Sequence, residues 1–126
     1  MKLTYTSFSW IDETKENIFS TPPLDYTLKM NGNTRVINFL DHENNEHYLE
    51  ISENTVFVKY GKRLLWLDIN KPRENVLNFD EEKNIVLKWV LLEINISISQ
   101  IDFSYEIYQG DTLLTTNVIL LKFFNK

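Results

Sequence analysis

The segment Glu46–Ile69, EHYLEISENTVFVKYGKRLLWLDI, constrains the fold of this chain more than any other stretch. Apolar residues alternate with polar ones through three short runs, which is the period of a half-buried strand. Ser52–Asn54 separates the first two runs. Gly61-Lys62 separates the last two, and Gly at the first central position suits a type II′ turn. The segment therefore predicts a β-meander of three antiparallel strands.

The composition favours the same class of fold. Aromatic residues make up 13% of the chain and alanine is absent. Aromatic and β-branched residues favour strands, whereas alanine is the best helix former. A length of 126 residues is typical of one domain. We therefore expect residues 1–126 to form a single all-β domain.

The rest of the chain reads as further strands joined by short polar turns. The runs with strand periodicity are Lys2–Ile11, a short one at Ile18–Phe19, Leu24–Met30, Thr34–Leu40, Val76–Phe79, Val86–Ile98, Ile101–Gln109 and Thr112–Phe124. Polar connections are predicted at Asp12–Glu16, Asn31-Gly32, Asp41–Glu46, Asn70–Asn75 and Gly110-Asp111. A helical turn competes with strand at Asp80–Lys83.

These nine to eleven short strands show no βαβ alternation, so an antiparallel sheet is expected. Sequential hairpins in one domain suit a sandwich or an up-and-down barrel, and closure into a barrel removes exposed edges. We predict a single antiparallel up-and-down β-barrel of about 8–10 strands, with Val86–Ile98 as a long, bent strand.

Charge and residue usage exclude several kinds of function. The net charge of −5 makes nucleic acid and anionic membrane poor partners, because both need basic surface. The absence of Cys excludes disulfides, thiol catalysis and cysteinyl zinc sites. The first residues lack an apolar signal core, and no apolar run approaches the ~20 residues of a spanning helix. These features predict a cytoplasmic protein.

The segment His42–His47, HENNEH, resembles a zincin motif at first sight. A zincin needs two residues between Glu and the second His, so that both imidazoles face one side of a helix. Here the second His comes one residue late, and Asn-Asn is a poor helix former. The segment is interpreted as a solvated hairpin loop, and no metal site, cofactor or catalytic residue is predicted.

Lys59–Arg63, KYGKR, is the basic cluster of an acidic chain, and Trp66 follows it. Lys59, Arg63 and Trp66 are the predicted ligand-binding residues, at the mouth of the barrel. A small platform for single-stranded nucleic acid is a weaker alternative. A third interpretation is a charged hairpin tip that discourages edge pairing.

Two segments resemble a known family. EISENTVFVKYGKRLLWLDI is similar to a strand, turn and strand of the YwiB-type family, in which a basic residue, one residue and Gly close the first strand; Lys59-Tyr60-Gly61 match that pattern. FSYEIYQGDTLLTTNVIL is similar to that family's last hairpin. The segment Asn78–Val86 departs from the family, because it lacks the usual Gly, and Lys59 replaces the usual Arg. The family comprises uncharacterised proteins of low-GC Gram-positive bacteria, and the resemblance implies a lipocalin-like (calycin) barrel but no activity.

Three hypotheses of function follow. The first is binding of a small, partly apolar ligand in the barrel, near Lys59, Arg63 and Trp66 or the inward aromatic residues. The second is an acidic protein-binding module, similar to immunity proteins or inhibitors, without a ligand cavity. The third is an enzyme that uses carboxylates such as Asp102 and Glu106, although no partner for them is visible in the sequence.

Overall fold

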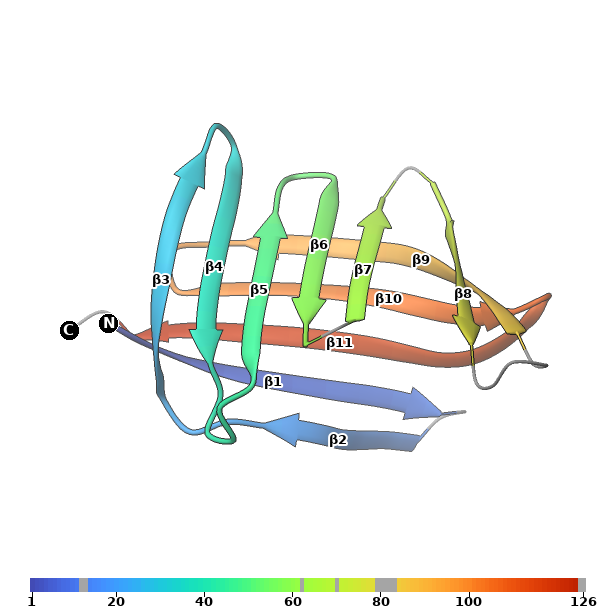
Figure 1. The fold of residues 1–126 in the computed structure, drawn as a ribbon, viewed down its shortest axis with the longest axis horizontal. Coiled ribbons are helices and arrows are strands. Elements are labelled where there is room, and N and C mark those ends of the chain that lie inside the picture. The colour runs from blue at the N-terminus through green and yellow to red at the C-terminus, as the bar shows by residue number, and fades with distance from the viewer. Residues whose placement is uncertain (12–13, 62, 70, 79–83, 125–126) are drawn as a thin grey trace.

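The computed structural model describes residues 1–11, 14–61, 63–69, 71–78 and 84–124. In these ranges the chain forms eleven strands and no helix (Figure 1). The strands are β1 (Lys2–Ile11), β2 (Thr14–Ser20), β3 (Leu24–Asn31), β4 (Thr34–Leu40), β5 (Glu46–Ile51), β6 (Thr55–Tyr60), β7 (Arg63–Asp68), β8 (Arg73–Asn78), β9 (Asn84–Ile96), β10 (Gln100–Gln109) and β11 (Thr112–Phe124). The predicted all-β class is confirmed.

All the strands belong to one antiparallel sheet with the order β7-β6-β5-β4-β3-β1-β11-β10-β9-β8, and β2 lies off this order, paired with β1. The N-terminal strand β1 joins two meanders, because it pairs with β3 at Lys2 and Leu3 and with β11 along nearly its whole length. At the two ends of the order, β7 contacts both β8 and β9. The sheet is therefore a nearly closed antiparallel barrel, as predicted.

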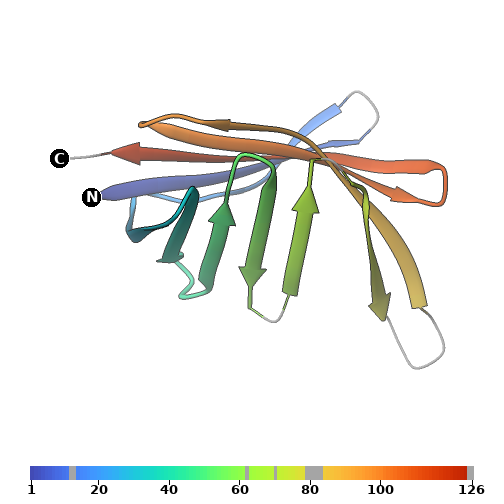
Figure 2. The same cartoon turned by 90° about the horizontal axis from the view of Figure 1, so that it is seen from above.

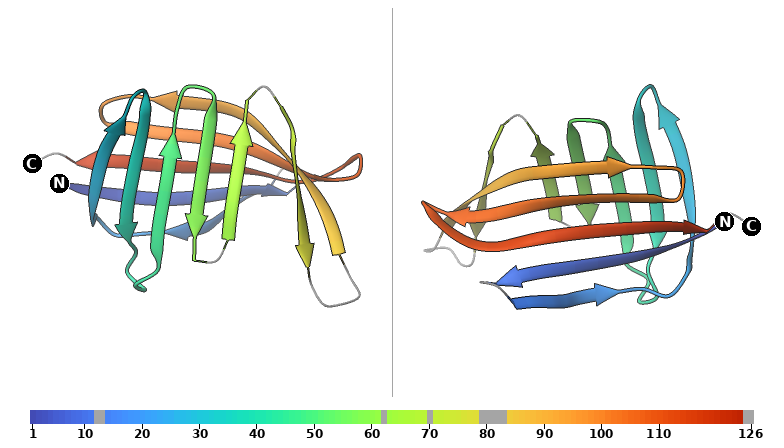
Figure 3. Two further views of the ribbon diagram at one scale, coloured as in Figure 1. Left: turned by 45° about the horizontal axis from the view of Figure 1, so that its top comes forward. Right: turned by 180° about the vertical axis from the view of Figure 1, so that it is seen from behind.

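The sheet folds back on itself as two layers. Strands β3–β7 lie side by side across the long strands β1, β11, β10 and β9, so the two sets of strands cross each other (Figures 1 and 2). Such crossing is typical of orthogonal sheet packing, where strands bend to pass from one layer to the other. The views from other sides show β2 beside β1, in the layer of long strands (Figure 3).

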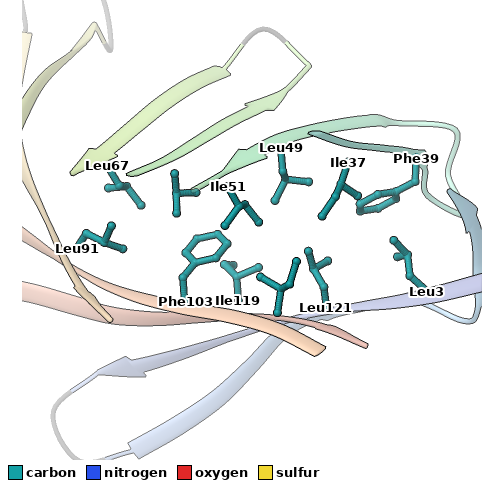
Figure 4. Close-up of a cluster of buried hydrophobic side chains, with 12 residues drawn as sticks. Leu3, Ile37, Phe39, Leu49, Ile51, Leu67, Leu91, Phe103, Ile119 and Leu121 are labelled. Carbon is teal, nitrogen blue, oxygen red and sulfur yellow. The ribbon is translucent and has the colours of Figure 1, made fainter. Parts of the chain in front are cut away.

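The core lies between the two layers. Figure 4 shows side chains from β4, β5 and β7 that point toward side chains from β1, β9, β10 and β11. The cluster consists of Leu3, Ile37, Phe39, Leu49, Ile51, Val56, Leu67, Leu91, Ile101, Phe103, Ile119 and Leu121. Within each strand these residues are two apart, so the alternation seen in the sequence is the division between core and surface.

Several predicted boundaries are wrong. Thr14–Glu16 belongs to β2 rather than to a turn, because this segment pairs with the far half of β1. Likewise Arg73–Asn75, predicted as loop, pairs with Leu87–Trp89 of β9. The helical turn considered at Asp80–Lys83 lies outside the described residues. The long strand at β9 is confirmed, and a register shift opposite Ser104 and Tyr105 accounts for its bend.

The Gly turns share one form. The β3–β4 turn is Gly32-Asn33 and not Asn31-Gly32, because Asn31 pairs with Thr34. Gly32 has φ 61° and Gly110, in the β10–β11 turn, has φ 60°. The residues that follow them, Asn33 and Asp111, do not have positive φ. Positive φ at the first central position alone is the mark of a type II′ turn, which favours Gly there.

Candidate functional site

A buried acid–histidine pair lies at the β4–β5 connection. Asp41 follows β4 directly and His47 is the second residue of β5. Asp41 Oδ2 lies 2.9 Å from His47 Nε2, and the two side chains are 0% and 5% exposed. Asp41 Oδ1 accepts hydrogen bonds from the backbone N–H groups of Glu43 (2.8 Å) and Asn45 (2.9 Å). Asp41 therefore fixes both the loop and the histidine.

Aromatic rings surround His47. Its ring stacks on Phe39 from β4, with centroids 4.6 Å apart and planes within 6°. Tyr60 from β6 lies 4.6 Å from it, and Tyr5 from β1 lies 5.1 Å from it. Phe19 from β2 lies 6.4 Å away at 24°. Both layers of the barrel thus contribute rings to one cluster.

A cavity of about 270 Å³ opens among these rings. We call it the aromatic cavity. It is lined by Tyr5, Ser7, Phe19, His47 and Tyr60, and its walls are mainly apolar. Tyr60, which lines it, is 38% exposed. Ligand sites are typically concave and mostly apolar with a few polar groups, and this cavity has that character.

The pair carries its charge on Asp41. Burial alone would raise the pKa of Asp41, but hydrogen bonds from His47 and from the backbone N–H groups of Asn45 and Glu43 lower it to about 2. Burial lowers the pKa of His47, although Asp41 partly offsets the effect. At neutral pH His47 is therefore an uncharged imidazole. Since Asp41 can only accept, the proton of the ring lies on Nε2 and the lone pair on Nδ1.

Two tyrosines of the interior resist ionisation. Burial, with Tyr105 and Tyr60 nearby, raises the pKa of Tyr5 well above its usual range. Burial raises the pKa of Tyr105 to about 12. Both hydroxyls are therefore neutral donors and acceptors at any physiological pH.

Alkaline titration is expected to report these two residues. The folded pKa values exceed the unfolded value of about 10, so their contribution to stability is complete below pH ~10 and is lost as the pH rises through ~12. Tyrosinate absorbance and circular dichroism, recorded together, should show the last tyrosines ionising as the β signal disappears. Tyr5→Phe should weaken this coupling. Ionisation of all six tyrosines in a folded protein would contradict the assignment.

Trp89 carries a buried polar atom without a partner. Its Nε1 is enclosed and, in the part of the chain that the structure describes, has no hydrogen-bond acceptor. Its ring lies 5.9 Å from that of Tyr105. An unpaired buried donor costs roughly 1–3 kcal/mol of stability.

We expect Trp89→Phe to lower the free energy of unfolding by less than about 1 kcal/mol, because removal of the unpaired N–H offsets the loss of buried ring area. Urea denaturation followed by circular dichroism measures the change. Trp66→Phe, at a half-exposed ring, is the control for the same exchange of side chains. A loss above ~2 kcal/mol for Trp89→Phe alone would mean that Nε1 is bonded in solution.

A second, larger hollow lies at the start of β3 and the end of β4. Its volume is about 680 Å³, and Lys2, Asp25, Asp41 and Glu46 are among the residues that line it. Lys2 and Asp25 form an exposed ion pair of 2.8 Å there. A ligand in this open, charged hollow would keep much of its surface in water, so the aromatic cavity is the better candidate.

The predicted site residues lie elsewhere. Lys59 and Trp66 are exposed on the outer face of the β5–β7 layer. Lys59 pairs with Tyr48 and Leu64, and Trp66 pairs with Phe57. They therefore do not line the aromatic cavity. Arg63 starts β7 opposite Tyr60, but its side chain lies outside the described residues. Whether these three residues bind a ligand stays a prediction.

The interpretation of His42–His47 as a solvated loop is wrong for His47, which belongs to β5 and is buried. His42, Glu43 and Asn44 are exposed, but Asp41 and His47 are buried and bonded to each other. In the described ranges, no group of three or more His, Cys, Asp or Glu residues is arranged to hold a metal ion. Asp102 accepts hydrogen bonds from Asn95 and Gln100, and Glu106 accepts one from Tyr108, so each carboxylate has an ordinary surface partner.

The strand alternation of β5 puts His47 on the buried face with Leu49 and Ile51 but does not supply its partner. The signal was present, since a lone His on a core-facing strand position needs a buried hydrogen bond. Phe39 pairs with His47 across the β4–β5 hairpin. Asp41, two residues after Phe39, is therefore the nearest acid on the inward side.

With this geometry established, comparison with known proteins shows one relationship of fold. Neither a family model nor a curated protein matches the chain. The crystal structure of the YwiB protein from Bacillus subtilis matches 98% of this chain and 91% of its own, with a TM-score of 0.65 and 16% sequence identity. The chain has a YwiB-like fold. The described residues contain no helix with the length and apolar character needed to cross a membrane.

Proposed function

We propose that this protein binds a small, partly apolar ligand in the aromatic cavity of its barrel. The observation that carries the proposal is the cavity of about 270 Å³ lined by four ring side chains and Ser7. An apolar cavity of roughly 150 Å³ already admits benzene, so this one has room for a one-ring or two-ring compound. We also infer that the chain is a divergent, cytoplasmic relative of the YwiB-type proteins.

Filling the cavity tests the proposal. In Ser7→Phe a ring is placed among the lining residues, whereas Thr6→Phe puts the same ring at the neighbouring, outward position. Small aromatic compounds should raise the melting temperature of the wild type and of Thr6→Phe, because a ligand of the folded state stabilises it. Ser7→Phe should lose the shift. Equal shifts in both variants, or none in the wild type, would refute binding in this cavity.

A second candidate function, protein binding, has an observation of its own. On the outer face of β5–β7, Phe57 and Trp66 lie 4.3 Å apart, and Tyr48 lies 6.2 Å from Phe57. Trp66 is 49% exposed, and Lys59 is two residues after its cross-strand partner Phe57 on the same face of β6. Exposed aromatic residues with a polar rim are frequent anchors of interfaces. Loss of a co-purifying protein in Trp66→Ser, with unchanged small-molecule shifts, would favour this function.

A further inference from the structure

The aromatic cavity contains one polar group whose hydrogen-bonding role is fixed. The hydroxyls of Tyr5, Ser7 and Tyr60 can each donate or accept, so they adapt to a ligand of either kind. His47 cannot, because Asp41 holds its Nε2 at 2.9 Å and, being ionised, can only accept. Nδ1 is therefore left as an acceptor.

The surroundings of His47 hold the ring in place. Phe39 stacks on the imidazole, and the two backbone N–H groups that bind Asp41 Oδ1 keep the carboxylate aligned. A ring that is held by its neighbours loses little further freedom when a ligand binds. Nδ1 is therefore a preorganised acceptor.

Charge in the cavity excludes anions. Asp41 is ionised and buried directly behind His47. The described residues that line the cavity include neither Lys nor Arg. An anionic ligand would lose its hydration without gaining a counter-charge, which is costly in a partly buried site. The rings of Tyr5, Phe19 and Tyr60 favour a flat apolar body.

We propose that His47 Nδ1 selects uncharged, planar ring compounds that carry a hydrogen-bond donor, such as a phenolic O–H or a ring N–H. The inference rests on the proposed function, since it names the class of ligand for the same cavity. It assigns His47 as the residue that sets specificity and Asp41 as the residue that positions it.

Matched probes test the inference on the wild-type protein. Phenol and anisole differ by the donor, as do indole and 1-methylindole, while benzoate adds a negative charge. Titration followed by amide chemical shifts gives each dissociation constant. We expect phenol and indole to bind about tenfold more tightly than their methylated partners, the factor that one hydrogen bond supplies. Benzoate should not bind.

The imidazole nitrogens supply a second readout. In the free protein, the ¹⁵N resonances of His47 should show a proton on Nε2 and a lone pair on Nδ1. Phenol should move the Nδ1 resonance toward the protonated range and leave Nε2 in place, whereas anisole should not.

The outcomes separate the two proposals. Equal affinity for phenol and anisole, with both in the cavity, would overturn the role of His47 and leave the proposed function standing. Tighter binding of benzoate than of phenol would also overturn it. Failure of every probe to bind would refute the proposed function, and this inference with it.

Discussion

Replacing Asp41 by alanine is expected to destabilise the fold by about 3–5 kcal/mol, the range seen when one partner of a buried pair is removed. The substitution leaves three donors without their acceptor, namely His47 Nε2–H and the backbone N–H groups of Glu43 and Asn45. Because a domain of this kind is stable by only about 5–15 kcal/mol, the loss is a large fraction of the total. Urea denaturation followed by circular dichroism measures it.

Two variants make the Asp41 experiment specific. Glu43→Ala removes an exposed carboxylate from the same loop and keeps the backbone N–H, so its stability should stay within ~0.5 kcal/mol of the wild type. Asp41→Asn retains an acceptor oxygen, so its loss of stability should lie between those of Asp41→Ala and Glu43→Ala. If Asp41→Ala is no worse than Glu43→Ala, the buried pair does not form in solution.

Phe103→Ala is expected to have the second large effect, a loss of about 3–5 kcal/mol. Phe103 is 1% exposed and is the largest of the fully buried side chains in the structure's described part. Its ring projects from β10 into the space between the two layers (Figure 4). Truncation removes apolar contacts and leaves a cavity that neighbours on two crossed layers cannot collapse to fill.

Phe124→Ala is the matched control for Phe103, because the same side chain is shortened at a position that is 48% exposed in β11. Its cost should be below ~1 kcal/mol. Similar losses for the two variants would mean that the layers do not pack at Phe103 as described here.

Much of the fold follows from local patterns. Alternation of apolar and polar residues located most strands, and Leu49 and Ile51 in β5 are buried as that alternation requires. Glycine located the turns. The β3–β4 turn was predicted at Asn31-Gly32 and lies at Gly32-Asn33. A dipeptide motif locates a hairpin turn but does not say which residue forms the last pair of the strands.

The remaining features depend on which strands pair and on contacts between distant segments. β2 is a strand because it pairs with the far half of β1, where β3 has already turned away. The aromatic cavity combines Tyr5 and Phe19 with His47 and Tyr60, from opposite layers of the barrel. Local periodicity does not predict contacts between residues of different layers. The sequence therefore indicates the basic cluster at Lys59 but not the buried Asp41–His47 pair.

The central claim is that a ligand enters the barrel among these rings and not on its outer face. Isotope-filtered nuclear Overhauser spectra of the protein with indole test it directly. We expect contacts from indole protons to the rings of Phe19, Tyr5 and Tyr60. Contacts to Trp66 and Tyr48 instead, or no contacts at a concentration that saturates the protein, would contradict it.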